Sequence, residues 1–117
     1  MATSILLVDD HAGFRACARR LLESEGCRVV GEAETCDCAV EAARALEPDV
    51  ALIDVYLPEP VGFELAERLG ALSAPPAVVM ISSRDGLELE GLVSRSGARG
   101  FVTKDELSRE AIEALLE

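Results

Sequence analysis

The chain has 117 residues and 50% of them are hydrophobic, which suits one domain with its own core. Its net charge of −11 argues against binding of nucleic acid or anionic membranes by this chain. No run of about 18 apolar residues occurs, so we expect no membrane-spanning segment.

The four cysteines do not suggest a disulfide framework. No signal peptide precedes Ser4, and the chain opens directly with an apolar strand pattern. We therefore expect a cytoplasmic protein with reduced thiols. Cys17 falls on an apolar helical stripe and is predicted to be a small core residue. Cys36 and Cys38 form a lone C-x-C pair without a second pair at zinc-site spacing, so we assign them no metal.

Short apolar runs alternate with amphipathic segments five times, as strands alternate with helices in an α/β protein. Gly26 stands just past the first amphipathic segment as a cap, and Pro48 stops the second. In chain order we predict a strand at Ser4–Val8, a helix with the stripe Phe14–Leu22, a strand at Arg28–Glu32, a helix at Cys38–Leu46, a strand at Asp49–Ile53, a helix at Phe63–Leu72, a strand at Ala77–Ile81, a helix at Gly86–Ser96, a strand at Gly100–Thr103 and a helix at Asp105–Leu116.

This strict alternation predicts a parallel sheet with helices on both faces. Five strands and five helices match a flavodoxin-like (βα)5 doubly wound fold with strand order 2-1-3-4-5. In such a sheet, ligands bind beyond the carboxyl ends of the strands, where the strand order switches. That point lies between the first and third strands.

Three carboxylates follow the strands that meet there. Asp9 and Asp10 follow the first strand, and Asp54 ends the third. Like charges at one place are costly unless a cation joins them. Magnesium takes oxygen ligands, keeps several waters and is typically held by one or two carboxylates plus a phosphate. We therefore predict a Mg²⁺ site at these residues.

Two more polar side chains follow neighbouring strands. Lys104 comes after the fifth strand, where its ammonium can reach the same pocket, and Ser82 comes after the fourth. A carboxylate, a dication, an ammonium and a hydroxyl suit phosphoryl transfer to a carboxylate nucleophile, because positioning and charge neutralisation supply most of that catalysis. His11 is expected to be a surface residue with no catalytic role.

Over essentially its whole length, the sequence resembles the receiver domains of two-component response regulators. No single matching piece identifies the family, but all of them together, in order and at strand ends, are highly specific for it. Within the family, Val-Asp-Asp-His and Gly-Ala-Arg-Gly-Phe-Val-Thr-Lys-Asp-Glu-Leu look most like the NarL/LuxR type. The pieces are the pair Asp9-Asp10, the run Asp54-Val-Tyr-Leu-Pro58 with Gly62, the pair Ser82-Ser83, Lys104, and Phe101 three residues before that lysine.

The resemblance implies roles for the reacting residues. Asp54 would be the phosphoacceptor, Lys104 would pair with the phosphoryl group, and Ser82 would hydrogen-bond one of its oxygens. The donor would be a phosphohistidine on a sensor histidine kinase or a small molecule such as acetyl phosphate. The chain would then catalyse its own phosphorylation and dephosphorylation without being a stand-alone enzyme.

The resemblance also implies a ligand set for Mg²⁺. Asp10 and Asp54 would bind the ion directly, and Asp9 would act mainly through a bound water. The backbone carbonyl of Tyr56 would be a further ligand.

A phosphoryl group on a side chain adds about −1.5 to −2 charge. In the family this charge draws Ser82 toward it and lets Phe101 turn inward. The face made by the fourth helix, fifth strand and fifth helix then changes and controls an output, here expected to be transcription. Phe101 equally suits an ordinary core position, so both readings stay open for it.

We expect residues 1–117 to form a single receiver domain with no output domain in this chain. Regulators of the NarL/LuxR type usually carry a C-terminal DNA-binding domain, so the chain is either a piece of such a regulator or a natural single-domain protein. Family members often dimerise through the first and fifth helices or through the fourth, and the sequence does not decide whether a homodimer forms.

Three other functions are alternatives to a phosphoryl-accepting switch. A haloacid-dehalogenase-like phosphatase needs a second acid where Tyr56 stands. A flavin carrier needs a Ser/Thr/Gly-rich phosphate loop where Asp9 and Asp10 stand, and these would repel the flavin phosphate. The main alternative is a pseudo-receiver, a protein-binding module that works without phosphorylation.

Overall fold

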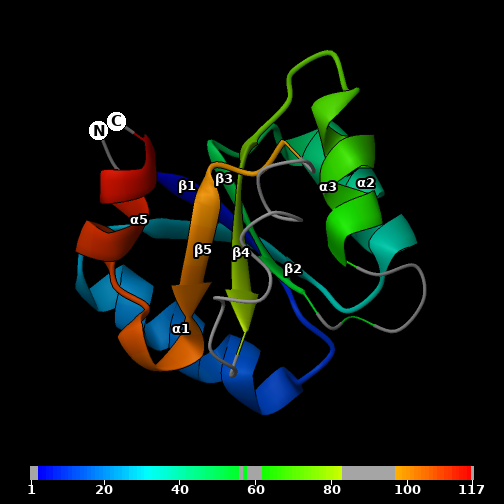
Figure 1. The fold of residues 1–117 in the computed structure, drawn as a ribbon. Coiled ribbons are helices and arrows are strands. Elements are labelled where there is room, and N and C mark those ends of the chain that lie inside the picture. The colour runs from blue at the N-terminus through cyan, green and yellow to red at the C-terminus, as the bar shows by residue number, and fades with distance from the viewer. Residues whose placement is uncertain (1–2, 56, 58–61, 83–96, 117) are drawn as a thin grey trace.

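The computed structural model describes residues 3–55, 57, 62–82 and 97–116 (Figure 1). The helix predicted at Gly86–Ser96 lies outside these residues. Among the described helices, none combines the length and the apolar character needed to cross a membrane. The elements are β1 (Ser4–Val8), α1 (Ala12–Ser24), β2 (Arg28–Ala33), α2 (Cys36–Leu46), β3 (Val50–Asp54), α3 (Gly62–Gly70), β4 (Ala77–Ser82), β5 (Gly100–Thr103), the 3-10 turn η2 (Lys104–Glu106) and α5 (Arg109–Leu116).

The five strands form one parallel sheet in the order β2-β1-β3-β4-β5. The predicted flavodoxin-like strand order is therefore confirmed. All five residues of β3, at the centre of the sheet, are buried, which explains its unbroken apolar sequence. The order reverses between β1 and β3, and ligands of such sheets bind beyond the carboxyl ends of the strands at this point.

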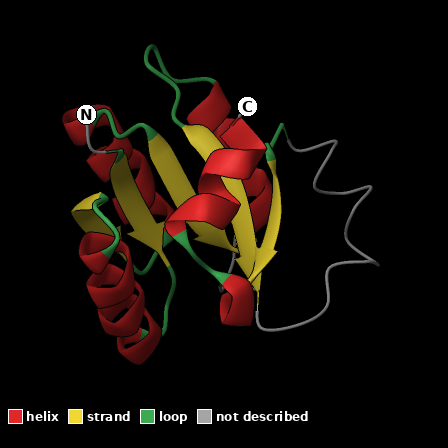
Figure 2. Ribbon diagram, turned by 90° about the vertical axis from the view of Figure 1, so that its left-hand side faces the viewer, coloured by secondary structure: helices red, strands yellow, loops and turns green. Residues whose placement is uncertain are grey.

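Helices cover both faces of the sheet (Figure 1; Figure 2). Because side chains alternate along a strand, each strand supplies both layers of the core. Leu6 and Ile53 belong to the layer under α2 and α3, with Val40 and Leu65. The other layer lies under α1 and α5 and includes Ile5, Leu7, Leu52, Leu22 and Ile112.

The apolar stripe of α1 is narrower than predicted. Ala18 and Leu22 are buried and Phe14 is partly buried, but Cys17 is exposed and Leu21 is 39% exposed. The prediction that Cys17 is a core residue is therefore wrong. Phe14, Ala18 and Leu22 are four apart and lie on one helical row. Cys17 and Leu21 each precede a member of that row by one position, which places them about 100° around the helix, at the edge of the buried face.

Three helices differ in their boundaries from those predicted. Helix α3 ends at Gly70, two residues before the predicted Leu72. Helix α2 begins at Cys36, two residues early, because the side chain of Thr35 caps it by accepting a hydrogen bond from Cys38 N at 3.2 Å. The helix predicted at Asp105–Leu116 is divided into η2 and α5, separated by Leu107 in an extended conformation. Ser108 then caps α5, since its Oγ accepts a hydrogen bond from Ala111 N at 3.0 Å.

Candidate phosphoryl-transfer site

The strand register brings the candidate residues to one edge of the sheet. Val8 pairs with Ile53, so Asp9 and Asp54 follow at the same level on adjacent strands. Ser82 pairs with Thr103, which places Lys104 just beyond the same edge. Residues from β1, β3, β4 and β5, separated by up to about a hundred positions in the chain, thus surround one point because parallel strands end on the same side.

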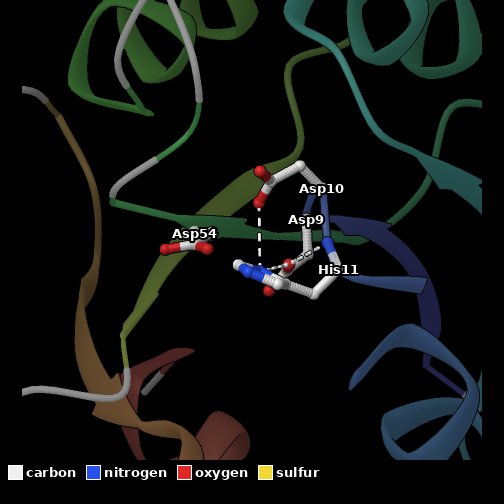
Figure 3. A group of neighbouring side chains, drawn as sticks. All are labelled: Asp9, Asp10, His11 and Asp54. Atoms are coloured by element: carbon white, nitrogen blue, oxygen red, sulfur yellow. Dashed lines mark hydrogen bonds and ion pairs between the residues drawn. The ribbon is translucent and has the colours of Figure 1, made fainter. Parts of the chain in front are cut away.

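The acidic side chains form a tight cluster (Figure 3). One ligand atom each from Asp9, Asp10, His11 and Asp54 lies within 4.8 Å of all the others. Asp9 is 1% exposed and Asp54 is 4% exposed, so two of the three carboxylates are removed from solvent. Such a concentration of buried negative charge requires a cation.

Lys104 supplies one positive charge to this cluster. Its Nζ lies 2.6 Å from Oδ2 of Asp9 and 3.4 Å from Oδ2 of Asp54. The same ammonium sits over the ring of Phe14, 4.2 Å from the ring centroid. Counting the described residues, one lysine faces three carboxylates, so the cluster keeps excess negative charge, which favours a further cation.

His11 takes a position that the sequence did not indicate. Its side chain is 69% exposed, as expected, but Nδ1 lies 3.1 Å from Oδ1 of Asp9 and 3.1 Å from Oδ1 of Asp10. The backbone N–H of His11 also donates to Oδ1 of Asp9 at 2.7 Å. The only available signal was that His11 directly follows the acidic pair.

Arg15 holds the main chain of the site in place and was also missed. Its Nη1 donates a hydrogen bond to the backbone carbonyl of Asp9, and its Nε lies 3.1 Å from Oε1 of Glu32. Glu32 is held in turn by Arg19. The available signal was the helical spacing that puts Arg15 one turn after His11, on the side of the acidic pair.

The remaining predicted residues are placed differently. Ser82 is completely buried at the end of β4. Phe101 is partly buried on β5 and packs against the core layer under α2 and α3, so it faces away from the α1 side. Tyr56, predicted to offer its carbonyl to the metal, lies outside the described residues.

The donor set fits a small divalent cation. Two buried oxygens, Oδ2 of Asp9 and Oδ1 of Asp10, accept no hydrogen bond within the described residues. Among the residues that the structure describes, the first is contacted by Lys104 in an ion pair and the second by His11. Buried carboxylate oxygens without hydrogen bonds are costly in metal-free protein and are suitable ligands for a hard dication.

Comparison with known proteins agrees with this geometry. Residues 5–117 match the family described as response regulator receiver domain. The response regulator UvrY of Escherichia coli O6:H1 is 34% identical over 113 residues, which cover 96% of this chain and 52% of UvrY. The chain thus spans about half the length of the curated relatives it matches.

Solved structures agree as well. A two-component response regulator of the LuxR family from Aurantimonas sp. SI85-9A1 superposes with a TM-score of 0.89 and 32% identity, covering 99% of this chain and 86% of that one. A signal receiver domain described as that of NarL from Mycobacterium tuberculosis has a TM-score of 0.85 and 34% identity, covering 98% of this chain and 94% of that one.

Proposed function

The chain belongs to the family of response regulator receiver domains, and from this premise we propose that it is a signalling switch phosphorylated on Asp54. Such domains are signalling proteins rather than classical enzymes. A sensor histidine kinase would be the physiological donor, and acetyl phosphate a substitute for it.

The observation that carries this proposal is the environment of Asp54. Its carboxylate is buried at the switch point of the sheet, in one cluster with Asp9 and Asp10, and the ammonium of Lys104 lies 3.4 Å away. A carboxylate nucleophile needs positive charge opposite it, because both it and the incoming phosphoryl group are anionic. Asp54 is the cluster member at the end of the central strand β3.

For the cation we propose Mg²⁺, held by Asp9, Asp10 and Asp54, with the backbone carbonyl of Tyr56 as a further ligand. This assignment is supported by the buried oxygens of Asp9 and Asp10 that accept no hydrogen bond from the described part of the chain. When bound, Mg²⁺ would supply positive charge to the carboxylates and to the phosphoryl oxygens.

The protein's own residues would carry out the transfer. An oxygen of Asp54 attacks phosphorus, a P–O bond forms, and the P–N bond to the donor imidazole breaks; the leaving imidazole keeps the bonding pair and takes up a proton. Lys104 would leave Asp9 to pair with a phosphoryl oxygen, and the hydroxyl of Ser82 would donate to another. Attack of water on the same phosphorus would later release phosphate and restore the carboxylate.

The output would follow from movement at β4 and β5. Ser82 and Phe101 lie on these neighbouring strands, where Met80 pairs with Phe101. A shift of Ser82 toward the phosphoryl group would change the space next to Phe101, and through it the face made with the predicted helix 86–96 and α5. Such a two-state element needs a bias of only a few kcal/mol.

The wider setting is inferred from relatives. Several are transcription regulators, so we propose a transcriptional output exerted outside residues 1–117. The net charge of −11 supports a receiver domain that does not itself bind DNA or an anionic membrane. Cytoplasmic localisation is part of the same proposal. A homodimer would suit a transcription regulator that binds a two-fold symmetric DNA site.

The test is the intact mass of the protein after incubation with acetyl phosphate and Mg²⁺. We expect one phosphoryl adduct in wild type that is lost in Asp54→Asn and when Mg²⁺ is omitted. The matched control is Asp37→Asn, because the Asp37 side chain is 90% exposed and lies outside the cluster. An adduct that persists in Asp54→Asn would contradict the proposal. No adduct from either acetyl phosphate or a histidine kinase, with no binding of Mg²⁺, would favour the pseudo-receiver.

A further inference from the structure

We propose that Nδ1 of His11 is an additional ligand of the metal site, so that this site also binds first-row transition dications such as Co²⁺ and Ni²⁺. This inference rests on the metal site of the proposed function. It adds a nitrogen ligand that phosphorylation with Mg²⁺ does not require.

The first argument is the position of the imidazole. The His11 side chain is 69% exposed, yet its ring lies against the acidic cluster, with Nδ1 3.1 Å from carboxylate oxygens of both Asp9 and Asp10 (Figure 3). The four candidate ligand atoms of Asp9, Asp10, His11 and Asp54 lie within 4.8 Å of one another. A metal with bonds of about 2.1 Å spans about 4.2 Å between opposite ligands. The set therefore needs to contract by only about half an ångström.

The second argument is how the ring is held. The backbone N–H of His11 donates to Asp9 at 2.7 Å, so the residue is fixed to the same carboxylate that its ring contacts. The ring itself is largely exposed and can turn by the small amount needed without disturbing the core. Coordination through Nδ1 would leave the ring proton on Nε2.

The third argument is ligand chemistry. Carboxylates and water suit Mg²⁺, whereas imidazole favours later first-row ions, and affinity at a given site generally rises from Mn²⁺ through Co²⁺ to Ni²⁺. With three carboxylates alone the site would distinguish these ions weakly. One imidazole nitrogen directed at the carboxylates should raise the affinity for Co²⁺ and Ni²⁺ and leave that for Mg²⁺ nearly unchanged.

The chain allows a direct test, because His11 is its single histidine. Any imidazole resonance in the NMR spectrum of protein labelled with ¹⁵N-histidine therefore reports on this ligand. The exposed thiols of Cys17 and Cys38 would compete for Co²⁺, so both are first replaced by serine. Co²⁺ and Mg²⁺ affinities are then measured by calorimetry for this background, for His11→Ala, and for the control Arg20→Ala on the exposed surface of α1.

We expect Co²⁺ to give the ring nitrogens large contact shifts. We also expect His11→Ala to weaken Co²⁺ binding by tenfold or more, to weaken Mg²⁺ binding by less than threefold, and Arg20→Ala to change neither. Co²⁺ binding with unshifted ring nitrogens, or with equal affinity in His11→Ala, would overturn the assignment of His11 and leave the carboxylate site intact. If the background protein with the two cysteines replaced bound neither Co²⁺ nor Mg²⁺, the metal site of the proposed function would be contradicted instead.

Discussion

The ammonium of Lys104 lies 2.6 Å from Oδ2 of Asp9, closer than its 3.4 Å distance from Oδ2 of Asp54. Asp9 is 1% exposed and the Lys104 side chain 14% exposed, so this is a mostly buried ion pair. The lysine thus compensates the carboxylate that precedes α1 and remains within reach of the candidate phosphoacceptor. The stability of the metal-free protein should depend on it.

We expect Lys104→Met to lower the free energy of unfolding by about 3 kcal/mol in EDTA, because removing one partner of a buried ion pair leaves the other charge uncompensated. Saturating Mg²⁺ should recover part of this loss by restoring positive charge. Urea unfolding with and without Mg²⁺ measures both effects. Arg68→Met is the control, because its ion pair with Asp37 is exposed and should contribute less than about 1 kcal/mol. An equal loss in the two variants would contradict the prediction.

Asp54→Asn should have the opposite effect on the metal-free protein. It removes one of three clustered carboxylates. The gain from weaker repulsion among the carboxylates, and from no longer burying this charge, should exceed the lost attraction to Lys104. We expect the free energy of unfolding to rise by about 1 kcal/mol in EDTA, and Mg²⁺ to stabilise the variant less than wild type. Thermal unfolding with Asp37→Asn as the matched control checks this; a variant less stable than wild type in EDTA would rule it out.

The cysteines should fall into two reactivity classes. Cys17 and Cys38 are exposed, whereas Cys27 is 7% exposed and Cys36 is 2% exposed. Burial raises the pKa of the Cys27 and Cys36 thiols, which lowers their thiolate fraction as well as their access to reagent. We expect a thiol-specific disulfide reagent to modify two cysteines rapidly in native protein and all four in urea. Rapid reaction of all four in native protein would be inconsistent with this packing.

The same two thiols should make the fold sensitive to alkali. Because their folded-state pKa values are raised above the ordinary 9.0, the folded protein retains these protons to a higher pH than the unfolded chain does. Their contribution should be constant below about pH 8 and be lost progressively as the pH rises past 9. Cys36→Ala should show a flatter decline in unfolding free energy between pH 8 and 10.5 than wild type. Parallel declines would count against a raised pKa.

A side chain at Gly26 should destabilise the fold. Its φ is +93°, and a Cβ placed there would lie 2.8 Å from Nη1 of Arg109, which donates to the carbonyl of Glu25. We expect Gly26→Ala to lower the free energy of unfolding by 1 kcal/mol or more. Gly13→Ala is the matched control, since Gly13 lies in α1 with no described atom within 4 Å of a Cβ placed there, and alanine favours helix. Urea unfolding should show a lower free energy of unfolding for Gly26→Ala and a higher one for Gly13→Ala. A change of the same sign in both variants would contradict the argument.

Local sequence signals predicted the sheet better than the helix ends. Each strand is an apolar run bounded by polar residues, and all five were located to within a residue at each end. The break between η2 and α5 was missed because Leu107 looks like one more apolar residue of a helix. It is buried in the core layer under α1 and α5, and that packing holds it in an extended conformation before Ser108.

The candidate site was only partly predictable. The proximity of Asp9, Asp10, Asp54 and Lys104 was predictable because each stands at or just past the end of a strand, and parallel strands end at one edge of the sheet. Arg15 was missed because its role depends on a hydrogen bond to a backbone carbonyl, which no residue pattern encodes. The expectation for Cys17 failed for a related reason: apolar spacing indicates a helical face but not how much of it a neighbouring sheet covers.

By itself, the sequence determined the order of elements, the parallel sheet and the set of acidic and basic residues at its edge. These follow from periodicity and strand polarity, which are local properties of the chain. Only the tertiary structure decided that Lys104 sits nearer to Asp9 than to Asp54, and that His11 turns over the carboxylates. Both depend on a balance of charge, burial and side-chain reach between segments far apart in the chain, and that balance exists only once the strands have assembled.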